Sequence, residues 1–127
     1  MEEKLLPVGV QKEEYASQPK YFRLNKAYQF QELLRFGKFK KTEHFSIRFL
    51  NKPESDLGFA IKATKKNFKK AHDRNYAKRR LRHLIYKSKP KFQGHMIIIA
   101  HKTVNAVKYA ELEKDFQSAI SSISKKL

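Results

Sequence analysis

The feature that most constrains this chain is a dense, ordered block of positive charge between residues 62 and 91. The block holds thirteen Lys or Arg residues and a single acid, Asp73, so it carries twelve of the seventeen net positive charges of the chain. Charge this dense repels itself and weakens a compact fold. We therefore expect the charge to lie on a surface that meets a polyanion.

Helical periodicity divides this block into two faces. At 100° per residue, one arc collects three cations and an amide, namely Asn75, Lys78, Arg79 and Arg82. A separate arc collects the apolar residues Ala77, Leu81, Leu84 and Ile85. This pattern predicts an amphipathic helix over residues 72–88, which Pro90 ends. The acids of an ordinary surface helix with balanced charge pairs are missing, so the basic face indicates nucleic-acid binding.

Length and composition exclude several classes of protein. A chain of 127 residues suits a single domain, and the absence of Cys excludes disulfides, thiolate metal sites and a cysteine nucleophile. No apolar stretch approaches the roughly 20 residues that a membrane-spanning helix needs. The acidic beginning of the chain has no apolar core of a signal peptide. We expect a cytoplasmic protein that does not contact membranes.

The remaining patterns predict an α+β fold in the order α-β-β-α-β-α. A first helix is expected between Asn25, as the N-cap, and Gly37. Alternating residues predict strands over 44–50 and 57–63, which should pair as a hairpin. The unbroken apolar run 96–100 is typical of a central strand, and helical spacing predicts a last helix that ends near residue 127. Helices should pack on one small mixed sheet within residues 21–127, with residues 1–20 a mobile or loosely docked extension.

The basic block also resembles a known signature. Six residues match the pattern A-x-x-R-N-R-x-K-R-x-x-R, namely Ala71, Arg74, Asn75, Lys78, Arg79 and Arg82. This pattern is similar to the one that opens the conserved helix of the bacterial ribonuclease P protein subunit, and the resemblance spans about residues 21–123. Two positions depart from it: Tyr76 replaces the second Arg of the signature, and His101 replaces a customary Arg or Lys.

The resemblance implies a function and a fold. It implies a protein subunit of ribonuclease P, the endoribonuclease that cuts precursor tRNA to make the mature 5′ end. The chemistry would be carried by a catalytic RNA subunit with bound Mg²⁺, and no protein side chain would be catalytic. The partners would be ribonuclease P RNA and precursor tRNA, with no obligate protein partner. The implied fold is similar to domain 2 of ribosomal protein S5, with a left-handed crossover between parallel strands.

Two sets of binding residues follow. The RNA subunit is expected to contact Arg74, Asn75, Lys78, Arg79 and Arg82 on the helix, with Lys65, Lys66 and Lys70 before it. A cleft for the 5′ leader is expected to include Phe30, Arg48 and Phe45, although Leu34 and Arg48 stand where relatives often carry aromatics. Asn75 suits a base edge or 2′-hydroxyl, or else braces a loop. Phe30 stacks on a base or belongs to the core, and Arg48 lies on the cleft floor or simply faces solvent. Arg80 is expected to be only solvated.

No catalytic or metal-binding side chains are predicted. The five His residues lack the spacing of known metal or catalytic motifs, and the acids Glu111, Glu113 and Asp115 lie where a helix N-terminus favours negative charge. Three other classes remain open. They are a general basic RNA-binding protein of the ribosomal or chaperone type, a DNA-binding protein with residues 74–89 as recognition helix, and a protein-only nuclease.

Overall fold

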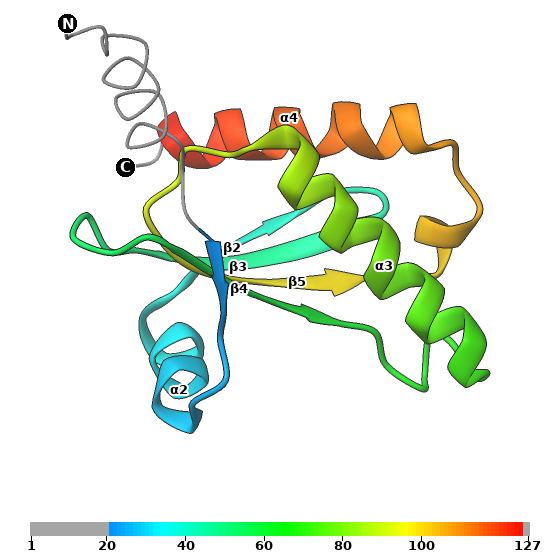
Figure 1. Ribbon diagram of the computed structural model, residues 1–127, viewed down its shortest axis with the longest axis horizontal. Helices are drawn as coiled ribbons and strands as arrows, with labels where there is room; N and C mark the ends of the chain where they lie inside the picture. Colours follow the sequence, from blue (N-terminus) through cyan, green and yellow to red (C-terminus); the bar gives the residue numbers. More distant parts are fainter. Residues whose placement is uncertain (1–20, 126–127) are drawn as a thin grey trace, which may run out of the picture.

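A computed structural model describes residues 21–125, and the predicted extension 1–20 lies outside this range. In this part of the chain five strands form one mixed sheet, with α2 on one face and α3 and α4 on the other (Figure 1). The elements in chain order are β1 (Tyr21–Arg23), α2 (Ala27–Phe36), β2 (Lys38–Lys41), β3 (Phe45–Asn51), β4 (Leu57–Lys62), α3 (Ala71–Ser88), β5 (Gly94–Ala100), the 3₁₀ helix η1 (Lys102–Asn105) and α4 (Tyr109–Lys125). The predicted α+β class is confirmed, and β1 and β2 add to the predicted order.

The predicted hairpin between the strands 44–50 and 57–63 is wrong. The order across the sheet is β1-β4-β5-β3-β2, so β5 lies between β3 and β4 and pairs with both. β5 runs parallel to β4 and antiparallel to β3. From Met96 to Ala100 its side chains are apolar on both faces, and such a strand is most stable where neighbours flank it and helices cover it. The connection after β3 passes the start of β5, where the Lys52 N–H donates to the Gln93 carbonyl at 3.0 Å.

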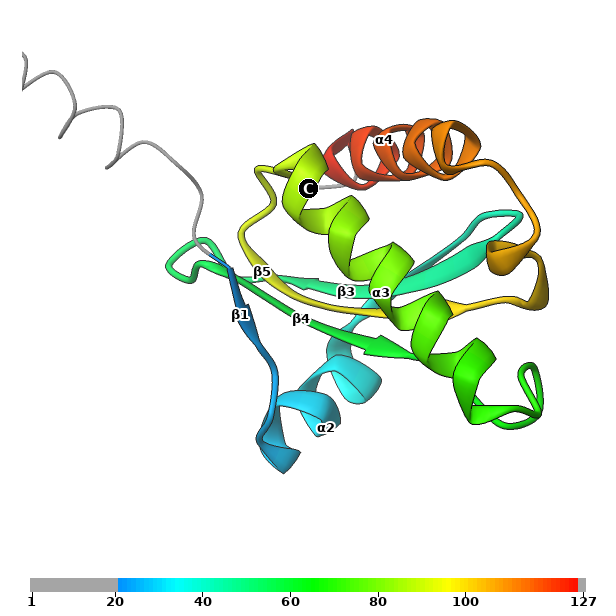
Figure 2. The same cartoon turned by 45° about the vertical axis from the view of Figure 1, so that its right-hand side comes forward.

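Two apolar layers lie on the two faces of the sheet. Phe45, Ile47 and Phe49 point to the side of α3 and α4, where they are fully buried with Met96 and Ile98. On the other face a smaller cluster joins Leu24, Leu33 and Ile97 under α2. Figure 2 shows the same arrangement after a rotation, with the sheet between α2 and the two longer helices. The strand alternation in β3 therefore separates a core face from the face that α2 partly covers.

The first helix begins at Ala27, not directly after Asn25. The side-chain oxygen of Gln29 accepts hydrogen bonds from the backbone N–H groups of Asn25 and Lys26, both at 3.1 Å. The Gln29 side chain thus satisfies backbone N–H groups at the start of the helix, and no capping hydrogen bond from the Asn25 side chain is needed. Gly37 follows the helix as predicted, but its φ of −72° is ordinary. Glycine is needed there because a Cβ would collide with the carbonyl oxygen of Leu33.

The basic helix α3 forms the crossover from β4 to its parallel neighbour β5. It spans Ala71–Ser88, within one residue of the predicted range, and its apolar stripe of Ala77, Leu81, Leu84 and Ile85 is buried. Lys89 ends the helix in the left-handed conformation, with φ of 48°, and Pro90 follows. The crossover joins parallel strands as the resemblance implies, and its left-handedness stays a prediction.

Candidate nucleic-acid interface

The basic face of α3 presents the predicted cations beside its buried stripe. Asn75 and Arg79 are exposed, and Lys78 and Arg82 are half-buried. Lys65, Lys66 and Lys70 are exposed in the connection that leads into the helix. Because Ala77 and Leu81 fasten the opposite side of the helix to the core, the cations are held on a rigid element. Such a face can neutralise closely spaced phosphates.

Arg74 has a second role that the sequence did not reveal. It is half-buried, and its Nη1 donates to the carbonyl oxygens of Phe68 at 2.9 Å and Lys69 at 3.2 Å. Asn67 fastens the same connection to the end of β5, donating from Nδ2 to the Ala100 carbonyl at 3.2 Å. Arg74 therefore shapes the Lys-rich connection in addition to adding charge. The pattern of the sequence could not separate these roles, since both favour Arg.

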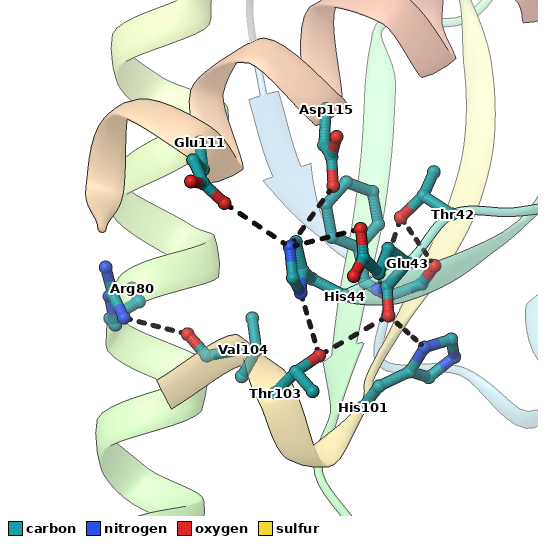
Figure 3. A network of polar contacts seen from close by, with 10 residues as sticks. Thr42, Glu43, His44, Arg80, His101, Thr103, Val104, Glu111 and Asp115 are labelled. Atoms are coloured by element: carbon teal, nitrogen blue, oxygen red, sulfur yellow. Dashed lines mark hydrogen bonds and ion pairs between the residues drawn. The ribbon is translucent and has the colours of Figure 1, made fainter. Parts of the chain in front are cut away.

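A polar network fastens α3 to η1 and to the start of β3 (Figure 3). Arg80 donates from Nη1 to the Val104 carbonyl at 2.8 Å, and its guanidinium carbon lies 5.6 Å from the centre of the Tyr76 ring. The expectation that Arg80 is only solvated is therefore wrong. On the other side of η1, the Thr103 hydroxyl lies 2.8 Å from Nδ1 of His44. These contacts fix the position of the basic helix relative to the sheet.

The acids near the start of α4 surround a buried histidine. Figure 3 shows Glu43, Glu111 and Asp115 pointing toward His44, whose Nε2 lies 4.0, 4.0 and 3.7 Å from their carboxylate oxygens. Glu113 instead pairs with Lys87 at 3.7 Å. Within residues 21–125, no group of His, Asp and Glu side chains is arranged to hold a metal ion. The cluster forms part of the attachment of α4 to β3.

The second surface is a groove on the face of the sheet that carries α2. It has a volume of about 600 Å³, and its walls come from α2, from four strands (β1, β3, β4 and β5) and from the residues between β1 and α2. Its lining includes Arg23, Leu24, Asn25, Phe30, Leu34, Arg48, Phe59, Ala60, Ile61, Lys62, Ile97 and Ile99. Apolar and aromatic side chains are thus mixed with three cations and with no acid. That combination suits a single-stranded nucleic acid, which offers bases to stack and phosphates to pair.

The structure brings together two of the three residues predicted for the cleft. Phe30 and Arg48 both line the groove, and Phe30 is half-buried against the cluster under α2. Phe45 does not belong to it, and that prediction is wrong. Its side chain is fully buried on the opposite face, where its ring packs against Phe116. The reason is the alternation of β3, which sends Phe45 and Arg48 to different sides of the sheet.

The shifted pKa values lie outside the groove. Burial raises the pKa of Tyr21 to about 12, and burial also raises the pKa of Tyr109. Burial lowers the pKa of His95, and the nearby Lys52 lowers it further. None of these three side chains lines the groove. The groove thus presents cations and apolar surface, which are features of a binding site.

Comparison with known proteins decides the family. The family model described as Ribonuclease P matches residues 19–124, which is most of the chain. The chain belongs to the ribonuclease P family. Membership makes it a tRNA-processing subunit, an RNA-binding component of a ribonucleoprotein that acts as an endoribonuclease. The match begins at residue 19, so nearly all of the predicted extension lies outside the family model.

Solved structures of the family share the fold. The RNase P protein from Staphylococcus aureus superimposes with a TM-score of 0.69 at 20% identity, covering 82% of this chain and 96% of that one. The RNase P protein from Thermotoga maritima gives a TM-score of 0.68 at 20% identity, covering 77% and 94%. A comparison with curated proteins found no match. No helix in the described residues has the length and apolar character to cross a membrane.

Proposed function

We propose that this subunit binds ribonuclease P RNA through the basic face of α3 and the 5′ leader of precursor tRNA in the groove beside α2. The RNA subunit, with Mg²⁺ bound mainly by that RNA, would carry out the cleavage in the cytoplasm. The protein would then be part of the enzyme without supplying a catalytic side chain. It would add contacts that hold substrate and catalyst together.

The observation that supports this proposal is the placement of the two surfaces. α3 packs on one face of the sheet and α2 on the other, so Arg79 and Phe30 belong to opposite layers. A protein built in this way can contact two RNA segments at once. The face of α3 carries mainly cations, which suits the backbone of a folded RNA. The groove mixes cations with apolar side chains, which suits unpaired bases.

The deciding experiment is cleavage of precursor tRNA by a bacterial ribonuclease P RNA at low Mg²⁺, with and without the protein. We expect strong stimulation, no cleavage when the RNA subunit is omitted, and a larger effect on substrates with a leader. Arg79→Ala should reduce stimulation, whereas Lys114→Ala, which removes an exposed cation on α4, should leave it unchanged. Tight RNA binding without stimulation would favour the general RNA-binding protein, and cleavage by the protein alone would favour a nuclease.

A further inference from the structure

One row of side chains crosses the sheet from the groove to its exposed edge. The strand register pairs Ala60 with Ile97, Ile97 with Arg48, and Arg48 with Phe39. Residues directly opposite each other in neighbouring strands point to the same face. Ala60, Ile97 and Arg48 all line the groove. Phe39 must therefore face the same side, one strand beyond the groove on the edge strand β2.

Phe39 lies next to Arg48, a residue that lines the groove. The guanidinium carbon of Arg48 lies 5.5 Å from the centre of the Phe39 ring, within the range of a cation–π contact. The Phe39 side chain is nevertheless 48% exposed, so the core does not account for its whole surface. Nucleic-acid bases stack on aromatic rings that are partly exposed and lie beside a guanidinium group, as the Phe39 ring does.

Positive charge surrounds this ring. β2 reads Lys38-Phe39-Lys40-Lys41 and contains no acid. In the next row along the sheet, Lys41 lies opposite Ser46, and Ile99 and Lys62 complete the row. The row thus ends in an exposed lysine on each side, and Lys41 lies about 7 Å along the strand from Phe39. A polyanion that left the groove over Arg48 would meet these charges.

We propose that Phe39 and Arg48 form a second stacking position, which extends the groove to the edge of the sheet and binds one further nucleotide of a single-stranded RNA. The inference rests on the proposed function, since the strand would be the leader of the precursor. Phe30 would hold one base under α2, and Phe39 would hold another near β2. The lysines of β2 favour a polyanion and oppose the pairing of this edge with a second copy of the chain.

The test measures the affinity of single-stranded RNA oligonucleotides from about two to about eight nucleotides long by fluorescence anisotropy. Wild-type affinity should rise with length until both stacking positions are filled. Phe39→Ala should lose about fivefold to tenfold on the longer oligonucleotides and little on the shortest. Phe39→Leu should show a similar loss, because it keeps apolar bulk and removes the aromatic face. Equal affinity of Phe39→Ala and wild type at every length would overturn the proposal.

Two further variants serve as controls for the Phe39→Ala result. Phe36→Ala removes another exposed aromatic, 64% exposed at the end of α2 and outside the groove lining, and should leave affinity unchanged. An equal loss in this variant would also overturn the proposal. Phe30→Ala distinguishes failure of the second stacking position from failure of the whole groove as the leader site. If it weakens binding while Phe39→Ala does not, only the second position fails. If neither substitution weakens RNA binding, the groove is not the leader site. A Phe39→Ala change in sedimentation, rather than in RNA affinity, would instead mark β2 as a self-association edge.

Discussion

Arg80 donates a hydrogen bond to the Val104 carbonyl at 2.8 Å, whereas its neighbour Arg79 is exposed on the basic face. Consecutive arginines in one helix therefore serve different purposes. Arg80 fastens the helix to η1, and Arg79 is free to meet a phosphate. The difference follows from the helical repeat, which turns successive side chains by 100°. The basic block therefore contains both a residue that braces the helix and an exposed cationic face, the face proposed to bind RNA.

This pair predicts opposite effects of two similar substitutions. Arg80→Ala should lower the free energy of unfolding by about 1–2 kcal/mol, because a buried carbonyl loses its charged donor. Arg79→Ala should change that free energy by less than about 0.5 kcal/mol. In RNA titrations at several salt concentrations, Arg79→Ala should reduce the slope of log affinity against log salt by about 0.9, the value of one phosphate contact. Urea denaturation measures the first effect. An unchanged slope would remove Arg79 from the interface.

Phe30 and Phe45 provide a second comparison across the sheet. Phe45→Ala should lower the free energy of unfolding by about 3–5 kcal/mol, because the ring is fully buried against Phe116. Phe30→Ala should cost less, since Phe30 is half-buried beside the groove. It should instead reduce the preference for substrate with a long leader over substrate with none. Chemical denaturation and binding to both substrates check this. A collapse of stability with unchanged leader preference would show that Phe30 serves only the core.

The outcome for β3 shows what periodicity could and could not predict. Alternation correctly separated Phe45, Ile47 and Phe49 from Arg48. It could not reveal which helix would cover which face, because that depends on contacts between distant parts of the chain. Because alternation places Phe45 and Arg48 on opposite faces, only one of them can line the cleft, and the packing of α2 decides that it is Arg48. The pairing of strands failed for a related reason: the apolar run of β5 indicates a central position without naming its neighbours.

The edge strand β2 was missed because its sequence carries no strand signal. Its residues Lys38–Lys41 contain one apolar side chain, and such strands form where a neighbour offers free backbone groups. α3 was predicted within one residue because charge, apolar stripe and Pro90 all indicate the same helix. The brace by Arg80 could not be predicted, since its partner is a backbone carbonyl 24 residues away.

His95 predicts how stability depends on pH. Its side chain is buried, its Nδ1 finds no hydrogen-bond partner among the described residues, and burial followed by Lys52 lowers its pKa in the folded protein. The unfolded chain therefore binds a proton more readily, near the ordinary pKa of about 6.5. Stability should fall as the pH drops below that value toward the lower pKa of the folded state.

The measurement compares wild type with His95→Gln by urea denaturation between about pH 7.5 and pH 5. Because both proteins keep His44 and His101, the difference between their pH profiles isolates His95. The variant should lose less stability over this interval than wild type does. His72→Gln is the control for the replacement of a histidine by glutamine, at a side chain that is 82% exposed. Parallel profiles for wild type and His95→Gln would contradict the prediction.

Gly94 predicts a backbone effect at the start of β5. Its φ of +139° is a conformation that L side chains rarely adopt, and a Cβ there would collide with the Leu50 carbonyl oxygen and lie 2.7 Å from the Lys52 nitrogen. Gly94→Ala should therefore lower the free energy of unfolding by about 1–3 kcal/mol from conformation alone, with a further cost for displacing β3.

Gly58→Ala is the matched control, because its Cβ would meet only the ends of the Phe22 and Leu24 side chains, at 2.6 and 2.7 Å. The exposed Phe22 ring can rotate away, so this loss should be smaller. Denaturation midpoints decide the order, and a larger loss in Gly58→Ala would mean that side-chain crowding under β1 matters more than the backbone of Gly94.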